Sequence, residues 1–320
     1  MHYDEVVLFY IFITDLFHLF NSENKGVSMS NYKIITDSTC DLPPKIIKEL
    51  GIHVIPMEYT LDGINHFQDV YDHGEKTRAF YNHLKEGKKP TTSMINIERY
   101  MEIFSGYLDQ ERDVLHISFS SALSGSHNAS RLATLELKER YPERIIRTVD
   151  SRAASIGQGL MVYHAAAMKE KGMDLTDLAD WIEKNTGSVR HWFTVEDLQH
   201  LKRGGRIGAI QAHVGTALSI KPILTVDAEG KLLNAGKVMG RKKSLTELFN
   251  RMKEESVDSE NQVIIIGHGD SREDAELLEK KIRQTLPVKD VILTYIGPII
   301  GSHTGPGMVG LTFMGEKNEN

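Results

Sequence analysis

Three short segments of this chain carry hydroxyl groups at a density that could bind an acidic group. They are Thr91–Ser93, Ser120–Ser126 and Gly301–Gly307, and the last two also contain glycine. The second segment follows the apolar run Val114–Phe119, which predicts a strand, and it precedes a helical pattern. At such a junction, free backbone N–H groups favour an anion, and hydroxyls donate without adding a full charge. The sequence therefore predicts a site for a carboxylate or a phosphate.

Each segment also has a purely structural interpretation. Thr91–Ser93 precedes a helix that Ser93 or a neighbour could cap, and Gly301–Gly307 could form a tight turn. One serine of Ser120–Ser126 can cap the next helix, but the other hydroxyls need further partners if they are buried. His303 lies among residues with almost no side chain, which exposes its ring or places it over a site. Together, the three segments favour a ligand site.

Two basic segments, Leu201–Arg206 and Gly240–Lys243, stand out in a chain with a net charge of −6 and a pI of about 6.2. A run of charges is most often a solvated surface. Arginine beside glycine can also approach a phosphate bidentately, so these loops could dock a phosphorylated ligand or a partner protein. The acidic balance argues against nucleic acid as a partner.

Motifs of several common enzyme classes are absent. The sequence has no GxxxxGK[ST] phosphate loop, no GxGxxG after a strand, no HExxH and no GxSxG, and its histidines do not fall into metal-ligand spacing with cysteine. Asp37 and Asp41 could act as an acid–base pair or hold Mg²⁺, although both stand where turns and helix caps favour aspartate. Cys40 lies beside them without a histidine nearby in the sequence, which argues against a thiol nucleophile. We expect no metal and no organic cofactor.

Strand and helix patterns alternate from Met29 onward, which predicts an α/β fold with a parallel, doubly wound sheet. After Gly172 the pattern changes, because Ser219–Val226 and Lys231–Val238 predict an antiparallel hairpin. We therefore expect an N-terminal domain with a mainly parallel sheet and a C-terminal domain of mixed α/β structure. The boundary is placed near residues 172–190, which gives domains of residues 29–185 and 186–320.

Length and composition fit this organisation. The 320 residues, of which 40% are hydrophobic and 26% charged, suffice for two soluble domains, and a single cysteine fits a reducing cytoplasm. Residues 1–28 are interpreted as an N-terminal extension outside the fold. Their apolar run Val6–Phe20 is interrupted by Asp15 and His18 and lacks a positively charged flank. A peripheral membrane or partner-binding helix, and a signal or anchor, are the alternatives.

The hydroxyl-rich and basic segments, taken in their order along the chain, resemble those of the DegV family. These are the fatty-acid-binding proteins that serve as carrier subunits of bacterial fatty acid kinase. The resemblance spans residues 33 to about 313. It implies a two-domain DegV-like fold with a lipid tunnel between the domains. The matching stretches are Thr36–Pro43, Thr91–Ser93, Ser120–Ser126, Val149–Ser151, Leu201–Gly208, Lys237–Lys243 and Gly301–Gly307.

The resemblance also implies how a ligand is held and used. Thr92, Ser124 and His303 match the residues that hold the lipid carboxylate, and Ser93 and Ser121 are expected as neighbours. Arg206, with Arg203 beside it, matches the loop that presents the ligand to the kinase. The chain is thus expected to be a carrier rather than an enzyme. It would bury the tail of a long-chain fatty acid and present the acid for acyl phosphate formation in phospholipid synthesis, with transient membrane contact. Uncharged donors would hold the acid and leave an oxygen free for phosphorylation.

Two other functions fit the residues. An enzyme acting on a small phosphorylated or carboxylated metabolite would use Asp37, Asp41 or His303, and it would need a polar cavity because such a substrate has no tail to bury. A regulatory protein whose DNA or partner binding responds to lipid is the third hypothesis, against which the acidic balance argues. A long slot lined by hydrocarbon between the domains would distinguish the carrier from both.

Overall fold

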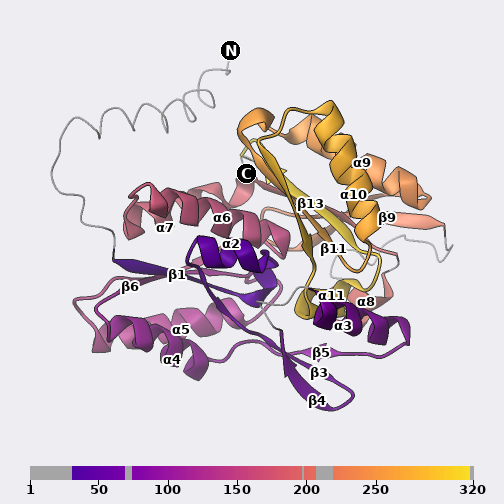
Figure 1. Cartoon of the computed structure of the whole chain (residues 1–320). Coiled ribbons are helices and arrows are strands. Elements are labelled where there is room, and N and C mark those ends of the chain that lie inside the picture. Colours follow the sequence, from indigo (N-terminus) through magenta and orange to yellow (C-terminus); the bar gives the residue numbers. More distant parts are fainter. Residues whose placement is uncertain (1–30, 69–73, 197, 207–218, 318–320) are drawn as a thin grey trace.

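The computed structural model describes residues 31–68, 74–196, 198–206 and 219–317 (Figure 1). The proposed N-terminal extension, residues 1–28, lies outside the described residues, as does the end of the segment Leu201–Gly208. Two main sheets, each covered by helices, form the body of the molecule.

The N-terminal sheet is parallel throughout, as predicted. Its strand order is β2-β1-β6-β7, and every neighbouring pair runs in the same direction. In Figure 1 helices α4 and α5 lie on one face of this sheet and α2, α6 and α7 on the other, which confirms the doubly wound arrangement. The elements are β1 (Tyr32–Asp37), α2 (Pro44–Glu49), β2 (His53–Ile55), α4 (Ile97–Leu108), β6 (Asp113–Ser118), α5 (Ser126–Arg140), β7 (Ile146–Asp150), α6 (Ile156–Glu170) and α7 (Leu175–Asn185).

The C-terminal sheet is mixed, also as predicted. Its order is β10-β9-β8-β13-β11-β12, in which β11 and β12 are parallel and the other neighbours are antiparallel. The pair β9–β10 confirms the expected hairpin. The elements are β8 (Val189–Thr194), α8 (Gln199–Arg203), β9 (Ile220–Val226), β10 (Leu232–Met239), α9 (Arg241–Glu255), β11 (Val263–His268), α10 (Arg272–Thr285), β12 (Asp290–Tyr295), α11 (Pro298–Thr304) and β13 (Val309–Met314).

Helix α6 joins the two sheets into one core. It packs against the turn after β1 and also against β8, β11 and β13 of the C-terminal sheet. Its first two turns are buried all round, as expected for a helix enclosed on every side. Gly159 permits this approach, because a Cβ there would lie 2.3 Å from the carbonyl oxygen of Cys40. Residues that line the space between the sheets are therefore held by a continuous apolar core.

A third, small sheet adjoins α11 and, through Tyr59 and Phe80, helix α3, and it holds the first hydroxyl segment. Its order is β4-β3-β5, and β5 pairs with β3 through Tyr59 and Thr92. The pattern of residues 53–61 predicts one strand, but the structure has two, separated at Pro56, which has no backbone N–H to donate. The elements are β3 (Glu58–Leu61), β4 (Ile64–Phe67), α3 (Glu75–Lys85) and β5 (Thr91–Thr92).

Two predicted segments near the site differ from the structure. The pattern of residues 195–201 predicts a helix there, but α8 lies further along the chain, at Gln199–Arg203. The expected glycine-rich loop Gly301–Gly307 is helical through Thr304, within α11. Gly301 misled the prediction because it serves close packing rather than a turn: a Cβ there would lie 2.6 Å from the Tyr81 hydroxyl.

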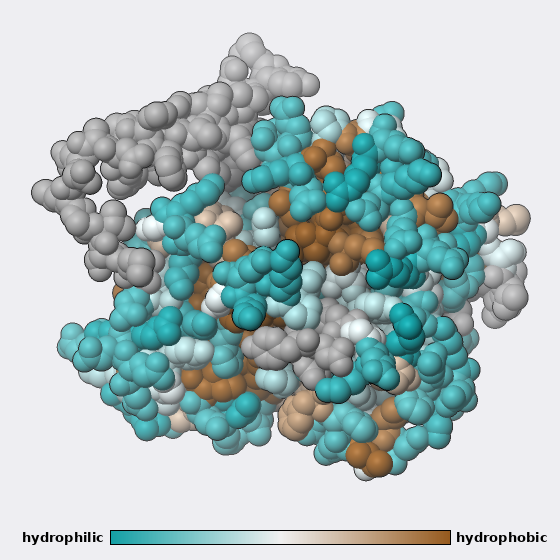
Figure 2. All heavy atoms as spheres, in the orientation of Figure 1, coloured by the Kyte–Doolittle hydropathy of each residue, from teal (hydrophilic) through white to brown (hydrophobic). Residues whose placement is uncertain are grey.

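The surface in the view of Figure 2 is mostly hydrophilic, with apolar residues gathered near β11 and β13 of the C-terminal sheet. Within the described ranges, no helix is both long enough and apolar enough to cross a membrane.

Candidate functional site

A pocket of about 100 Å³ lies between the N-terminal and C-terminal sheets. One water molecule occupies roughly 10–15 Å³ on the same scale, so the pocket is several times larger than a water site. Residues from both halves of the chain line it, and most of them are apolar. Such a lining suits a hydrocarbon rather than a small polar metabolite. The apolar residues are Met57, Met94, Phe119, Leu123, Ala154, Ile156, Trp192, Phe193, Leu201, Val226, Leu232, Ile299, Ile300, Met308 and Leu311.

Several of the predicted site residues meet in this lining. Thr92, Ser93, Ser124 and His303 all contribute to it. The Oγ1 atom of Thr92 lies 2.9 Å from Nε2 of His303, although the two residues are 211 positions apart. The structure therefore joins the first and third hydroxyl segments through a direct hydrogen bond.

Strand β5 positions the first segment. The two threonines form it, as the strand preference of β-branched residues favours, and Tyr59 of β3 pairs with Thr92. The backbone N–H of Ser93 then donates to the carbonyl of Glu58 at 3.1 Å. Helix α4 is capped by Asn96, which accepts from the N–H of Arg99, so the capping interpretation of Ser93 is wrong.

The second segment is held by its own serines. Ser124 Oγ lies 3.0 Å from Ser126 Oγ and accepts from the Ser126 N–H at 3.2 Å. Ser126 Oγ also accepts from the N–H of Ile95, just after β5, which ties this turn to the first segment. Ser120 donates to the carbonyl of Gly230 in the β9–β10 turn. Ser124 is thus the serine of this turn that both lines the pocket and remains partly exposed.

His303 lies on α11 with its ring half-buried. Burial is the main cause that lowers the pKa of the imidazole to about 4, and the nearby charges of Arg206 and His200 contribute to the same shift. The ring is therefore neutral at pH 7. Its Nδ1 atom is buried and has no hydrogen-bond partner among the described residues. One nitrogen thus contacts Thr92, and the other faces Gly204.

Arg206 also lines the pocket. Its Nε donates to the carbonyl of Leu123 at 3.2 Å, and its Nη1 to the carbonyl of Gly204 at 2.6 Å. A guanidinium therefore lies near the ring of His303, in addition to the uncharged donors that the sequence predicts for the acid. From the sequence, Arg206 is expected to contact a partner protein. Nothing local in the sequence shows that Arg206 contacts the second hydroxyl segment, at the carbonyl of Leu123.

The structure does not bring Ser121 and Arg203 to the pocket that Thr92, Ser124 and His303 line. Ser121 is exposed, and its backbone N–H donates to Asp150 Oδ1 at 3.2 Å. Arg203 is exposed on α8, where its guanidinium contacts Nδ1 of His200 at 2.9 Å. Neither is among the residues that line the pocket.

Asp37 and Asp41 are buried and fully engaged by the protein itself. Asp37 accepts from the N–H of Thr39 at 3.0 Å, and Asp41 accepts from Ser155 Oγ at 2.6 Å and from the Gly297 N–H at 2.9 Å. Burial raises the pKa of both carboxyls, that of Asp41 to about 7. Neither lines the pocket. Their geometry connects the loop after β1 to α6 and to α11, which is a structural role.

Sequence reasoning missed His191, which lines the pocket from β8 and is 7% exposed. Burial lowers its pKa to about 4, and its Nε2 accepts from the Ala154 N–H at 3.4 Å. A Cβ on Gly157 would lie 1.8 Å from that nitrogen. A glycine in the first turn of a strongly apolar helix was the available signal of such a close neighbour. In the described part of the chain, no three His, Cys, Asp or Glu residues gather as metal ligands.

Comparisons with known proteins agree on one family. The family model for DegV, described as "Uncharacterised protein, DegV family", matches residues 31–316. A DegV domain-containing protein from Clostridium perfringens is 44% identical over 291 residues, covering 91% of this chain and 100% of that protein.

Solved structures share the fold. One, described as fatty acid binding of a DegV family protein from Thermus thermophilus, matches with a TM-score of 0.81 at 30% identity and covers 89% of this chain and 100% of that one. Another, a stearic acid-binding protein from Eubacterium ventriosum, matches with a TM-score of 0.79 at 25% identity and covers 89% of this chain and 98% of that one.

Proposed function

Because this chain belongs to the DegV family, we propose that it binds a long-chain fatty acid. The tail would lie in the apolar pocket between the proposed domains, residues 29–185 and 186–320. The carboxylate would lie at Thr92, Ser124 and His303, with Ser93 beside them. The observation that carries this proposal is the Thr92–His303 contact within an otherwise mostly apolar lining.

The tail supplies most of the binding energy. About 15 methylenes at roughly 0.8 kcal/mol each give a gross gain of about 12 kcal/mol. Immobilising the ligand and ordering the lining take back several kcal/mol. The described binding of fatty acid by the relative from Thermus thermophilus, and of stearic acid by the one from Eubacterium ventriosum, supports this ligand class.

The polar group fixes the orientation of the acid. The hydroxyls of Thr92 and Ser124 and a ring N–H of His303 can donate to carboxylate oxygens. Since the ring is neutral at pH 7, it acts as a donor rather than as a charge. Arg206 adds a guanidinium whose Nε and Nη1 already donate to backbone carbonyls. The acid is then held mainly by neutral groups.

The proposal extends to the use of the bound acid. A separate fatty acid kinase would phosphorylate it to an acyl phosphate for phospholipid synthesis, and this chain would be a cytoplasmic carrier with transient membrane contact. Arg203, exposed on α8 next to the pocket-lining Leu201, is then a residue for contact with the kinase, together with Arg206. An enzyme of small metabolites is less well supported, because the pocket is mostly apolar and Asp37 and Asp41 are already engaged.

The test of ligand class is direct. Protein purified from a bacterial host should contain co-purified long-chain fatty acid by extraction and mass spectrometry, and the delipidated protein should bind oleate. Replacement of His303 by alanine should weaken oleate binding by about tenfold or more without unfolding the protein. A lipid-free preparation that also rejects added oleate would rule out the carrier.

The kinase step has its own test. Arg203→Ala should bind oleate as the unmodified protein does but support slower acyl phosphate formation when a fatty acid kinase and ATP are added. Lys45→Ala, an exposed substitution on α2, is the matched control. Equal rates for the two variants would remove Arg203 from the kinase contact.

A further inference from the structure

We infer that Gly204 is a positioning residue for His303, and that α8 is the element that holds the imidazole in place against Thr92. The inference rests on the proposed function in one respect, the role of His303 as a ligand for the carboxylate. It adds to the site a residue, Gly204, that has no side chain and acts only by positioning His303.

The contact between Gly204 and His303 leaves no room for a side chain. A Cβ built on Gly204 would lie 2.0 Å from Nδ1 of His303, and the three nearest atoms all belong to that ring. Gly204 has φ −72° and ψ −7°, which any residue adopts. Space, rather than backbone conformation, therefore requires glycine at this position.

The same packing recurs along α8 and α11. Gly305 lies against His200, where a Cβ would be 2.4 Å from the ring, and Gly307 lies against Glu196, where a Cβ would be 2.4 Å from Cγ. The segment 196–206 thus packs onto the segment 298–307 at three glycines. An imidazole clamped between Gly204 on one side and Thr92 on the other has little freedom to rotate.

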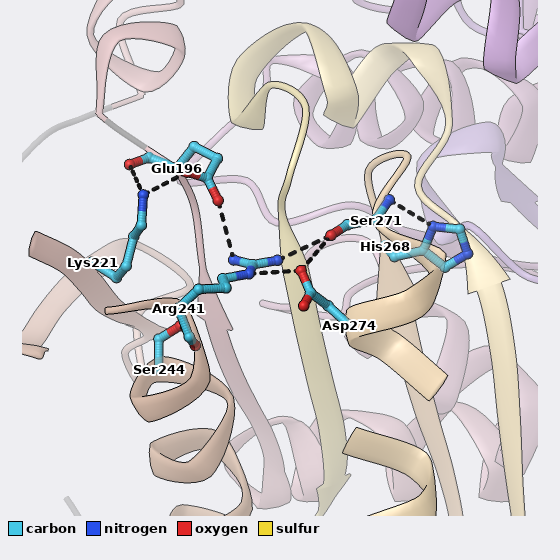
Figure 3. Close-up of polar contacts among 7 residues, drawn as sticks. All are labelled: Glu196, Lys221, Arg241, Ser244, His268, Ser271 and Asp274. Atoms are coloured by element: carbon cyan, nitrogen blue, oxygen red, sulfur yellow. Dashed lines mark hydrogen bonds and ion pairs between the residues drawn. The ribbon is translucent and has the colours of Figure 1, made fainter. Parts of the chain in front are cut away.

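A charged network holds the start of this segment. Figure 3 shows Glu196 between Lys221 and Arg241, and the Arg241 guanidinium reaching Asp274 and Ser271. Arg241 Nε donates to Asp274 Oδ2 at 2.8 Å, and the Arg241 side chain is only 19% exposed. The basic segment Gly240–Lys243 therefore contributes Arg241 to the protein's own packing. It anchors the chain that leads into α8.

The test measures the His303 ring as well as the ligand. In delipidated Gly204→Ala, we expect the ring to leave its buried place, so that its pKa, followed by NMR, rises from about 4 by about one unit or more. The pKa of fully buried His116 should stay unchanged. Oleate affinity should fall by about tenfold or more, as in His303→Ala. Gly106→Ala is the matched control, because nothing lies within 4 Å of a Cβ there.

A double variant separates positioning from general damage. In the His303→Ala background the ring is gone, so Gly204→Ala should change oleate affinity by less than about twofold. If Gly204→Ala alone does not fold, the double variant should fold. The inference is overturned if Gly204→Ala keeps normal affinity and an unshifted ring, if the two losses multiply, or if neither variant folds. Failure of the unmodified protein to bind oleate would sink the proposed function, whereas the ring measurement would still decide this one.

Discussion

Two polar clusters of this protein differ in how completely their residues are hydrogen-bonded. Asp37 at the end of β1 and Asp41 in the loop that follows accept from backbone N–H groups and hydroxyls of their own chain. His303, across the pocket, contacts Thr92 through one nitrogen and leaves the other without a partner among the described residues. A group whose partners all come from its own chain stabilises the fold, whereas a polar residue that lines a pocket, as His303 does, can contact a ligand.

A third residue shows that lack of a partner alone does not make a site. His116 is fully buried beside Tyr100 and Phe104, and neither of its ring nitrogens has a hydrogen-bond partner in the described structure. No pocket reaches it among those described. Access to the pocket therefore distinguishes His303 from His116.

The largest expected effect comes from breaking the satisfied cluster. Asp41→Ala leaves the Ser155 hydroxyl and the Gly297 N–H buried without their acceptor, at about 1–3 kcal/mol each. We expect the free energy of unfolding in urea to fall by about 3 kcal/mol or more. Asp41→Asn is the control, since the amide can still pair with both groups, and it should lose less than half as much. An Asp41→Ala protein as stable as the unmodified one would contradict the structural role.

His116, buried without a hydrogen-bond partner among the described residues, should lower the stability of the folded protein at acidic pH. Burial, and then the charge of His127, lower the pKa of His116 to about 3. Unfolded chains take up a proton at His116 near pH 6.5, whereas the folded protein does so only near pH 3, so this group lowers stability as the pH falls through that range. Between pH 7 and pH 5 the loss is about 2 kcal/mol.

His116→Leu checks this acid sensitivity. The variant should lose about 2 kcal/mol less than the unmodified protein between pH 7 and pH 5, measured as free energy of unfolding in urea at both values. The raised pKa of Asp41 acts in the opposite direction over the same range, but it is common to both proteins and cancels. Parallel losses in the two proteins would contradict the prediction.

Two serines of the same turn test which residues hold the carboxylate. Ser124 lines the pocket and Ser121 does not. Ser124→Ala should weaken oleate binding by about tenfold, or about 1.4 kcal/mol, whereas Ser121→Ala should stay within about twofold. Isothermal titration of delipidated protein measures both. Equal losses for the two variants would show that the turn acts as a whole rather than through Ser124.

The smallest expected effect concerns the charge beside the ring. Arg206→Ala removes one of the charges that lower the pKa of His303, so that pKa should rise from about 4. Burial is the larger cause and remains, so the rise should be less than about one unit. NMR titration of the ring measures it, with exposed Arg203→Ala as the control. A fall in the pKa of His303 would contradict this arrangement.

Most of the fold could be predicted from local patterns. The sequence pattern predicts helices over residues 75–85 and 97–108, and these bounds match α3 and α4, because apolar spacing and a cap such as Asn96 are local properties. The last turn of α11 could not be predicted, because Gly301 lowers the local helix propensity. Only the close contact of Gly301 with Tyr81 explains why glycine occupies that position. Thr92, Ser124 and His303 came from a family resemblance, because nothing local relates positions 211 apart.

Local sequence patterns are enough to predict the alternation of strands and helices, the parallel and mixed sheets, and the three hydroxyl segments that mark the site. These follow from side-chain periodicity and turn chemistry within a few residues. The tertiary structure decided which polar groups keep hydrogen-bonding capacity. Asp41 is satisfied by Ser155 and Gly297, and His303 is held against Gly204, by segments far along the chain. Hydrogen bonds and steric exclusion act over a few ångströms, so only folding brings such partners within range.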